Sequence, residues 1–518
     1  MSRIRIYTRN LLANWVGYIA NLVVAFCLAP LVVHTLGKGT YGVWVVLSSV
    51  TGYLGLVEMG TQAGLGRYVN FYLGRNEIDK VNGILNTALA FFMAVGVVLL
   101  LAAGGVGLAF GTLFPKVPAE LLPVARPALM LVALNLWLSF LGTSFSLVLT
   151  SFERFDISNA INLVVLGIRT VGTIVVLKAG GGIVSLALVQ VVSSVVGVVG
   201  AWLSARVIFT EMRLHPTRIS LRRFKELFAF SIWSFLSQVA MRLMYLTDEI
   251  VILILLGAEQ VTFYALPLML INYGRGLVDH MAGVVGPQTI KASSVGNLGE
   301  LRTILGWGSK ILMYVTIPLF VGMIFYGEEF FVLWQGPDFR ISGSVLILLA
   351  IPQLFVMGVR PTVSIIKGLG YVRFGALITL AQGLANLGLT LLFVMGMGMG
   401  LYGVALGTLV PAVIFNCVVV AFVLRWIRYP GAWFVGNNVV RWAVMAALFC
   451  GVCLAVNLLP GKEAWGWFAL KVVGLILISF AAGWYVIFSG GERAKLRGKL
   501  ADLFGGRKQD PTGPADVQ

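Results

Sequence analysis

The sequence predicts an all-α integral membrane protein with about fourteen transmembrane helices, and three observations lead to this fold class. Hydrophobic residues make up 59% of the 518 residues and charged residues only 11%, whereas soluble proteins contain about 25% charged residues. The apolar residues gather in long runs of about 20, the length that a helix needs to cross a bilayer. The basic residues gather in alternate connections between these runs.

The apolar runs are long and continuous, which favours helices over the short alternating strands of a membrane β-barrel. The first run follows Arg3, Arg5 and Arg9, as the core of a signal peptide would. It is longer than such a core and no small-residue cleavage site follows it, so we expect a retained helix. The runs cover residues 11–33, 41–60, 84–110, 127–150, 160–178, 183–207, 228–253, 261–286, 305–326, 343–366, 375–395, 401–424, 442–459 and 468–488.

The distribution of basic residues predicts the orientation. Of the 38 lysines and arginines, 26 fall in the termini and connections on the N-terminal side of the predicted membrane, and six fall in the connections on the other side. Short cytoplasmic loops are rich in Lys and Arg, so we expect both termini to be cytoplasmic and the chain to lie in a bacterial inner membrane. The net charge of +17 is then explained by topology and anionic membrane lipids, and no nucleic-acid partner is expected.

Two halves of the chain resemble each other. Leu36-Gly37, followed by Tyr41, corresponds to Leu256-Gly257, followed by Tyr264, and residues 182–188 correspond to 400–406, at offsets of 220 and 218 residues. Each half holds six predicted helices, so the two halves have the same orientation, which predicts a parallel repeat of the kind that transporters use for alternating access.

The chain therefore divides into five parts. A basic amphipathic stretch around Arg222 and Phe224 separates the halves and is expected to lie along the lipid headgroups. A C-terminal tail rich in Gly, Pro and charge is expected to be disordered. The parts are an N-terminal six-helix bundle (1–207), a cytoplasmic amphipathic linker (208–227), a C-terminal six-helix bundle (228–424), helices 13 and 14 (425–490) and a cytoplasmic tail (491–518).

Several short motifs resemble a known family. Asn10-Leu-Leu-Ala-Asn14, Leu36-Gly37-Lys-Gly-Thr-Tyr41-Gly-Val-Trp44 and Tyr53-Leu-Gly-Leu-Val-Glu58-Met-Gly60, together with Thr247-Asp248-Glu249, are similar to the polysaccharide transporter branch of the multidrug/oligosaccharidyl-lipid/polysaccharide exporter superfamily, which includes O-antigen flippases. Members often have aspartate where this chain has Glu58. The resemblance implies a flippase that moves a polyprenyl-pyrophosphate-linked oligosaccharide from the cytoplasmic to the periplasmic leaflet by alternating access, for surface polysaccharide biosynthesis such as that of lipopolysaccharide, and other polysaccharide assembly proteins are candidate partners.

Four arginines within the predicted helices are candidate contacts for the pyrophosphate. They are Arg169, Arg242, Arg275 and Arg360. Ionisable groups inside a membrane usually face a cavity or a partner, and the planar guanidinium binds phosphate through paired hydrogen bonds. The alternative is that they only pair with acidic residues: Arg275 lies four residues from Asp279 on one helix face, and Arg242 lies seven residues from Glu249. Arg169 has no acidic residue nearby in the sequence.

The other polar residues of the helices are candidate site residues as well. Asn14, Tyr18 and Asn21 fall on one face of the first helix and are candidate contacts for the sugar hydroxyls, or for a neighbouring helix. Glu58, Asp248, Glu249 and Asp279 are candidates for binding a coupling ion, Na⁺ or H⁺, because a buried carboxylate has a raised pKa. The alternative is that they are helix caps or ion-pair partners.

Two other functions compete with the flippase. One is an ion-coupled small-molecule antiporter of the multidrug branch, which fits the same repeat but not the anion-binding arginines. The other is a membrane-embedded glycan polymerase, which would need catalytic residues in a large outer loop; the predicted outer loops are short. No metal-ligand cluster and no phosphate-binding loop occurs in the sequence, so neither an enzyme nor a resident cofactor is expected.

Overall fold

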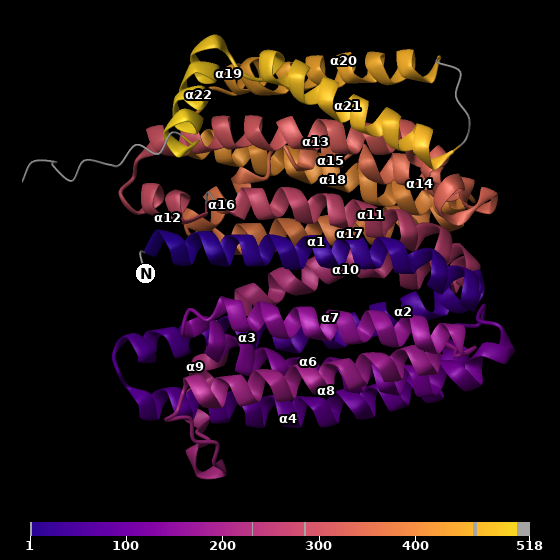
Figure 1. Cartoon of the computed structure of the whole chain (residues 1–518), viewed down its shortest axis with the longest axis vertical. Coiled ribbons are helices and arrows are strands. Elements are labelled where there is room, and N and C mark those ends of the chain that lie inside the picture. The colour runs from indigo at the N-terminus through magenta and orange to yellow at the C-terminus, as the bar shows by residue number, and fades with distance from the viewer. Residues whose placement is uncertain (1–2, 230–231, 284–285, 459–463, 505–518) are drawn as a thin grey trace, which may run out of the picture.

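The computed structural model of the chain describes residues 3–229, 232–283, 286–458 and 464–504. This part of the chain is helical and contains no strand, so the predicted all-α membrane class is confirmed. The long helices run side by side and alternate in direction (Figure 1). We call the end of the molecule at which α1 begins the near end and the opposite end the far end.

The first bundle is formed by the helices before the linker, and it occupies the lower part of Figure 1, with α1 at mid-height. A 3₁₀ turn, η1 (Ala119–Leu121), precedes α6 at the far end. The helices are α1 (Arg3–Leu36), α2 (Lys38–Leu54), α3 (Leu56–Gly74), α4 (Ile78–Leu108), α5 (Phe110–Leu113), α6 (Leu122–Ser151), α7 (Phe155–Lys178) and α8 (Ile183–Ile208).

The linker holds a 3₁₀ turn, η2 (Pro216–Arg218), and the short helix α9 (Leu221–Ala229), and the second bundle follows it. The second bundle contains a 3₁₀ turn, η3 (Pro337–Phe339), and a π-helical turn, η4 (Leu392–Gly396). Its helices are α10 (Ile232–Leu255), α11 (Ala258–Gly283), α12 (Gly286–Ser294), α13 (Leu298–Gln335), α14 (Arg340–Ala350), α15 (Gln353–Val356), α16 (Pro361–Gly368), α17 (Val372–Leu391) and α18 (Gly400–Trp426).

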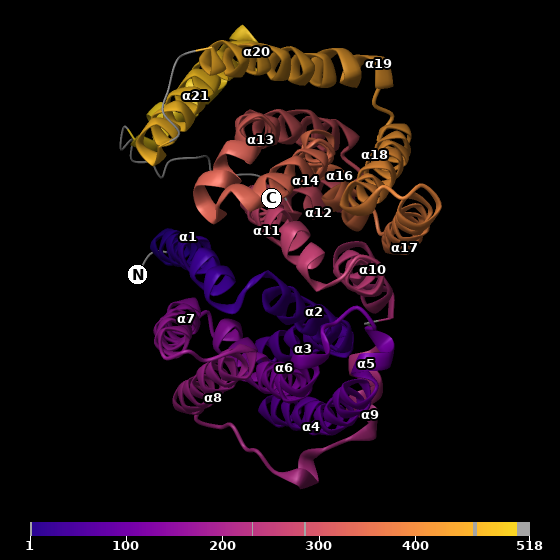
Figure 2. The ribbon, with the colours of Figure 1, turned by 90° about the vertical axis from the view of Figure 1, so that its right-hand side faces the viewer.

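The C-terminal helices lie against α13, on the outside of the second bundle (Figure 2). They are α19 (Gly431–Phe434), a π-helical turn η5 (Val435–Val439), α20 (Val440–Asn457), α21 (Trp465–Val486) and α22 (Gly490–Phe504). The helix α22 differs from our expectation that the tail from residue 491 is disordered: the described part of the tail is helical, and residues 505–518 lie outside the described residues.

The same pairs of helices contact each other in the two bundles. In the first bundle α1 packs on α7, α7 on α8, α2 on α6, α4 on α6 and α6 on α8. In the second bundle the helices of the same rank pair in the same way: α10 with α17, α17 with α18, α11 with α14, α13 with α14, and α14 with α18. This equivalence agrees with the parallel repeat that the sequence predicts.

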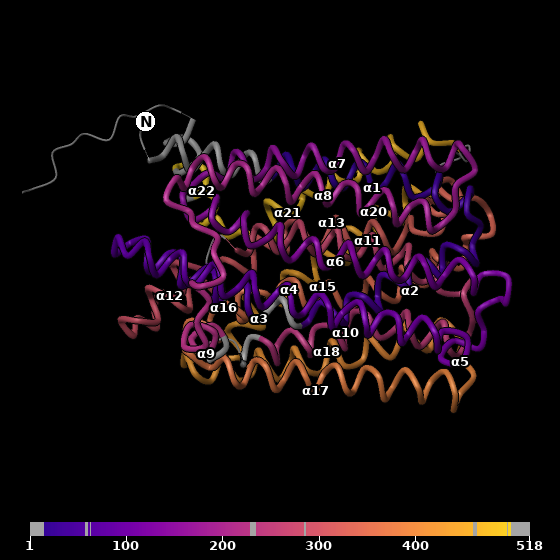
Figure 3. The backbone as a smooth tube through the Cα atoms, turned by 90° about the horizontal axis from the view of Figure 1, so that it is seen from below, coloured from indigo at the N-terminus to yellow at the C-terminus, as the bar shows by residue number. Residues whose placement is uncertain are grey.

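Each of the fourteen predicted segments coincides with one helix or a short series of helices. Within the described residues, eleven helices are long and apolar enough to cross a membrane by length and composition. The remaining three of the fourteen predicted segments do not meet this criterion. The segment at 41–60 corresponds to α2 with the start of α3, the segment at 228–253 to α10, and the segment at 261–286 to α11. They run beside the other helices (Figure 3), and α2 packs against both α10 and α11 at the interface between the bundles.

Proline and glycine interrupt two of the predicted helices. The predicted helix at 343–366 is divided into α14, α15 and α16, with Pro352 just before α15 and Pro361 at the first position of α16. Proline lacks the N–H of a helical hydrogen bond and is tolerated best in a first turn. The second predicted helix ends after 17 residues at Gly55, and α3 continues beyond it to the near end.

Candidate functional site

The predicted substrate-contacting residue Arg169 lies near the middle of α7, and its side chain is exposed. It lines a cavity of about 170 Å³ to which α1, α2, α7, α8 and α11 contribute, with Trp44, Gln190 and Tyr273 among the lining residues. Among the residues that the structure describes, none forms a hydrogen bond or an ion pair with the Arg169 guanidinium. A permanent cation at this depth therefore has its hydrogen-bond donors available for an anion.

The candidate polar residues of α1 divide between this cavity and the contact with α11. Asn21 lines the cavity, and its amide donates a hydrogen bond of 2.9 Å to the Gly17 carbonyl of the same helix. The Tyr18 hydroxyl donates to the Tyr273 carbonyl oxygen at 2.5 Å, and the Tyr18 ring lies 4.7 Å from the His280 ring, between centroids. Tyr18 thus holds α1 against α11. The side chain of Asn14 lies outside the described residues.

Arg360 and Asp279 form an ion pair within the second bundle. The guanidinium Nε and Nη2 of Arg360, which directly precedes α16, lie 2.5 and 2.9 Å from the two carboxylate oxygens of Asp279 on α11. A bidentate pair of this kind is the strongest arrangement for these groups. Asp279 is therefore engaged by Arg360, not by Arg275, its neighbour four residues away on α11.

Arg275 instead lies against an aromatic ring. Its guanidinium is hydrogen-bonded to the Tyr245 hydroxyl of α10, and its central carbon lies 4.2 Å from the centroid of the Tyr245 ring. The side chain is buried, and the Nε atom has no hydrogen-bond partner. Arg275 is thus held in the second bundle with one donor still unused.

Arg242 lies on α10 where this helix faces α2 of the first bundle. The Tyr53 hydroxyl of α2 is 3.2 Å from the Arg242 carbonyl oxygen, which accepts its hydrogen bond, and Gly52 of α2 is also close to the Arg242 guanidinium. The carboxylate of Glu249, the predicted alternative partner of Arg242, is hydrogen-bonded to Ser49 of α2. Arg242 and Glu249, two of the three charged residues of α10, therefore lie at the interface between the bundles.

A buried polar cluster surrounds Asp248. Its carboxylate accepts hydrogen bonds from the hydroxyls of Tyr264 on α11, at 2.7 Å, and Thr408 on α18, at 2.8 Å. The Asn386 amide of α17 donates to the same Thr408 hydroxyl at 2.9 Å. Two further oxygens in this region, Asn386 Oδ1 and Thr390 Oγ1, are buried and have no hydrogen-bond partner.

Asp248 is predictable from the sequence as a charged residue within an apolar run, but the neutral residues around it are not. Tyr264, Asn386, Thr390 and Thr408 are ordinary polar residues in apolar runs, and hydrogen bonds from such residues between helices are common. The one usable signal was the spacing of Asn386 and Thr390, which places two polar side chains on one helix face. The last candidate for ion binding, Glu58, lies in α3, and its side chain is outside the described residues.

An apolar cavity of about 270 Å³ lies between the second bundle and the appended helices. It is lined almost wholly by apolar side chains from α1, α11, α13, α14, α20 and α21, including Phe26, Phe330, Phe449 and Phe468. Such a lining favours hydrocarbon. The molecule therefore offers a cation-lined cavity and an apolar cavity, both with walls from α1 and α11.

Comparison with known proteins places this arrangement among carbohydrate-related membrane proteins. A family model described as polysaccharide biosynthesis protein matches residues 7–293, more than half of the chain. The uncharacterized membrane protein EpsK of Bacillus subtilis is 22% identical over 472 residues, which cover 89% of this chain and 91% of EpsK. A candidate O-antigen transporter of Shigella flexneri is 22% identical over 427 residues, which cover 81% of this chain and 97% of the transporter.

Solved structures of transporters share the fold. An inward-facing multidrug resistance transporter of the MATE family, in the MOP superfamily, superposes with a TM-score of 0.69 at 16% identity and covers 80% of this chain and 94% of its own. The lipid II flippase MurJ in its inward closed conformation gives 0.68 at 14% identity, covering 92% and 98%. An outward-facing MATE transporter gives 0.58 at 17% identity, covering 82% and 95%.

Proposed function

The chain belongs to the polysaccharide biosynthesis protein family, and we propose that it is a flippase that moves a polyprenyl-pyrophosphate-linked oligosaccharide from the cytoplasmic to the periplasmic leaflet of a bacterial inner membrane. In this proposal the near end is cytoplasmic, as the excess of basic residues there indicates, and the two bundles rock against each other. The surface polysaccharide that receives the oligosaccharide is of the O-antigen or lipopolysaccharide kind.

The observation that carries the proposal is the available guanidinium of Arg169 in a cavity between the bundles. A pyrophosphate that leaves the headgroup zone loses its hydration and needs a cation that forms several hydrogen bonds. Asn21 and Gln190 in the same cavity supply amide groups of the kind that bind sugar hydroxyls. The names of the O-antigen transporter relative and of the lipid II flippase with the same fold are consistent with this substrate class.

The apolar cavity near α21 is the proposed place for the start of the polyprenyl chain. Its apolar walls would keep the chain of the substrate in a hydrocarbon-like environment while the pyrophosphate is near the arginines. In this arrangement Arg275 and Arg242 contact the pyrophosphate after Arg169, and Arg360 does so only if it separates from Asp279.

The first prediction concerns Arg169. We expect Arg169→Ala to reduce flipping about tenfold or more, because a charge-assisted hydrogen bond to phosphate is lost, and Arg169→Lys to retain part of the activity because charge without the planar fork remains. The measurement is transfer of a short polyprenyl-pyrophosphate-linked oligosaccharide in proteoliposomes, together with surface glycan in cells at matched protein levels. Arg126→Ala, an exposed far-end change, is the control. Normal flipping by Arg169→Ala would refute this role of the cavity.

The multidrug-type antiporter is the competing function, and the MATE fold favours it as the second candidate. The variant Arg169→Ala distinguishes the antiporter from the flippase. An antiporter of small cations would gain or keep transport when a cavity cation is removed, since like charges repel. A flippase for a pyrophosphate would lose it.

We further propose that the Asp248 cluster binds the coupling ion, Na⁺ or H⁺. A carboxylate surrounded by hydroxyl and amide oxygens suits a small hard cation, and the two oxygens without partners, on Asn386 and Thr390, are free to join it. Glu249, Asp279 and Glu58 are further candidates that the same test can rank.

The second prediction follows from linkage between ion binding and stability. We expect Na⁺, compared with K⁺ at equal ionic strength, to raise the melting temperature of the purified protein if Na⁺ is the ion, and Asp248→Asn to abolish this rise. Asp156→Asn, in the first turn of α7 at the near end, should leave it unchanged. If H⁺ is the ion, lowering the pH, and not adding Na⁺, should raise the melting temperature, and Asp248→Asn should abolish that rise. A protein whose stability and flipping respond to neither ion, or respond equally in Asp248→Asn, would contradict the assignment.

A further inference from the structure

Two turns that occupy equivalent places in the two repeats meet at the far end of the molecule. One joins α1 to α2 through Gly37, and the other joins α10 to α11 through Gly257. Both glycines have positive φ angles, 79° and 105°, which glycine adopts without strain. Directly after these turns lie a lysine in the first bundle, Lys38, and a glutamate in the second, Glu259.

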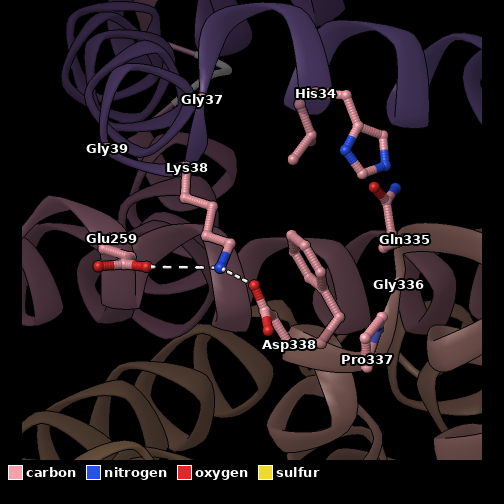
Figure 4. Close-up of a pocket in the computed structure, with 11 residues that line it drawn as sticks. His34, Gly37, Lys38, Gly39, Glu259, Gln335, Gly336, Pro337 and Asp338 are labelled. Atoms are coloured by element: carbon pink, nitrogen blue, oxygen red, sulfur yellow. Dashed lines mark hydrogen bonds and ion pairs between the residues drawn. The ribbon is translucent and has the colours of Figure 1, made fainter.

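Lys38 bridges the two bundles at this point. Its ammonium lies 2.8 Å from a carboxylate oxygen of Asp338 in η3 and 3.7 Å from one of Glu259 on α11 (Figure 4). We call Lys38, Glu259 and Asp338 the far-end ion-pair cluster. Both acidic residues belong to the second bundle and the lysine to the first, so each ion pair crosses the interface.

Further contacts hold Lys38 in place. Its ammonium lies 5.4 Å from the centroid of the Phe263 ring and 5.6 Å from that of Phe339, both in the second bundle. Cation–π contacts of this length add to the ion pairs. The backbone takes part as well, because the Thr262 hydroxyl donates a hydrogen bond of 2.6 Å to the Lys38 carbonyl oxygen.

A cavity of about 580 Å³ lies beside the cluster. It is lined by residues of both bundles, and His34 and Gln335 lie on the side away from the carboxylates (Figure 4). Gln335 is 2% exposed, and both polar atoms of its amide lack a hydrogen-bond partner. An unsatisfied amide is costly where it is buried. Separation of the bundles would let water form hydrogen bonds with this amide and would thereby lower its free energy.

We propose that the far-end ion-pair cluster holds the two bundles together in the conformation described here and that it breaks when the far end opens. The proposal rests on the proposed function only for its role in transport, namely that the far end is the exit for the oligosaccharide. The conformational role of Lys38 stands on the contacts themselves and is tested without substrate.

The exposure of the cluster indicates a weak, reversible contact. The side chain of Lys38 is 27% exposed, and those of Glu259 and Asp338 are 57% and 71% exposed. Ion pairs this exposed contribute little each, and salt screens them. We therefore expect the cluster and its ring contacts together to change the ratio of closed to open molecules about three- to tenfold, enough to bias an equilibrium without blocking it.

The test is a distance measurement on the purified full-length protein. Spin labels are placed through Glu120→Cys in the first bundle and Arg340→Cys in the second, both exposed at the far end, after the four native cysteines have been replaced by alanine. Double electron–electron resonance then reports the separation of the bundles. We expect Lys38→Glu to shift the distribution to longer distances, and the double variant Lys38→Glu with Asp338→Lys to restore the original distribution.

Two controls make the result specific. Lys178→Glu makes the same charge change in another exposed far-end residue of the first bundle and should leave the distances unchanged. Raising NaCl from about 0.05 M to about 1 M shortens the Debye length and weakens the ion pairs. The distance between the labels should therefore increase in the protein with the unaltered cluster but not in Lys38→Ala. An unchanged distribution in Lys38→Glu, or a shift that the charge swap fails to reverse, would overturn the proposal. If only the proposed function is wrong, Lys38→Glu should still shift the label distances, but the protein should flip no oligosaccharide.

Discussion

Gly42 lies on α2 at the place where the two bundles come closest. A methyl group at this position would overlap the carbonyl oxygen of Ala258, at the start of α11. The carbonyl is part of one helix backbone and the methyl carbon would be bonded directly to the other, so neither can move alone, and relief requires the helices to separate. Only glycine permits this approach, which places Lys38 and Glu259 within reach of each other.

We predict that Gly42→Ala opens the far end in the same way as Lys38→Glu and destabilises the closed conformation by about 1–3 kcal/mol, the usual cost of overpacking. The measurement is the same label pair at residues 120 and 340. Gly39→Ala is a matched control, because that glycine lies one turn earlier on α2 and has open space around it. Equal distance changes in the two variants would show that close packing at residue 42 is not the cause.

The charged residues of the site show how far single residues can be predicted from sequence. The sequence identifies arginines that lie inside the membrane, because each interrupts an apolar run. It does not identify their partners: Arg275 and Asp279 are one turn apart on α11, yet Asp279 pairs with Arg360, just before α16, and Arg275 contacts Tyr245 of α10. Tertiary packing decides these pairs, and nothing in the spacing of the residues encodes it.

At the scale of the helices, each of the fourteen predicted segments is helical in the structure because each is a long run rich in apolar residues, although only eleven of the described helices are long and apolar enough by themselves to cross a membrane. The ends and interruptions of the helices are less predictable. Pro352 and Pro361 divide one segment into three, whereas Pro30, Pro267 and Pro411 lie inside continuous helices. Neighbouring helices can satisfy the backbone groups that a proline frees, so the outcome depends on surroundings that the sequence does not show.

The three least apolar segments share one position in the structure. The helix α2 is short, α10 carries Arg242, Asp248 and Glu249, and α11 carries charges at both ends. These helices pack against one another at the interface between the bundles. Reduced hydropathy in an otherwise apolar chain thus marks the helices that line the candidate transport path, as charged residues within membranes generally do.

The linker between the bundles is attached to the first bundle by two asparagines of α4. The Asn82 amide donates to the Glu211 carbonyl at 2.9 Å and accepts from the Arg213 N–H at 2.7 Å. The Asn86 amide repeats this with the Arg213 carbonyl and the His215 N–H, at 2.7 and 2.8 Å. The linker is therefore anchored to the first bundle, and the rocking proposed above would move the second bundle relative to both.

For the molecule as a whole, the appended helices are joined to the second bundle by polar contacts within an apolar interface. On α13, Lys310 is 1% exposed and pairs at 2.8 Å with Glu492 of α22, and Glu329 pairs with Lys471 of α21. Burial raises the pKa of the Glu492 carboxyl, but hydrogen bonds from Lys310 and the Ser489 N–H outweigh it, and the pKa lies below its usual value. Glu492 is thus charged at neutral pH.

We predict that a chain ending at residue 429 still inserts and forms both bundles but unfolds at a lower temperature. Lipid can replace the apolar packing on α13 at little cost, whereas Lys310 loses its counter-charge, and an uncompensated buried charge costs about 3–5 kcal/mol. Adding Lys310→Met and Glu329→Gln to the shortened chain should therefore recover much of the lost stability, measured as the melting temperature of the purified protein in detergent. Lys291→Met, a change at an exposed near-end lysine, should recover none. Equal melting temperatures for the shortened chain with and without Lys310→Met and Glu329→Gln would mean that apolar packing, not ion pairing, joins the appended helices to the bundles.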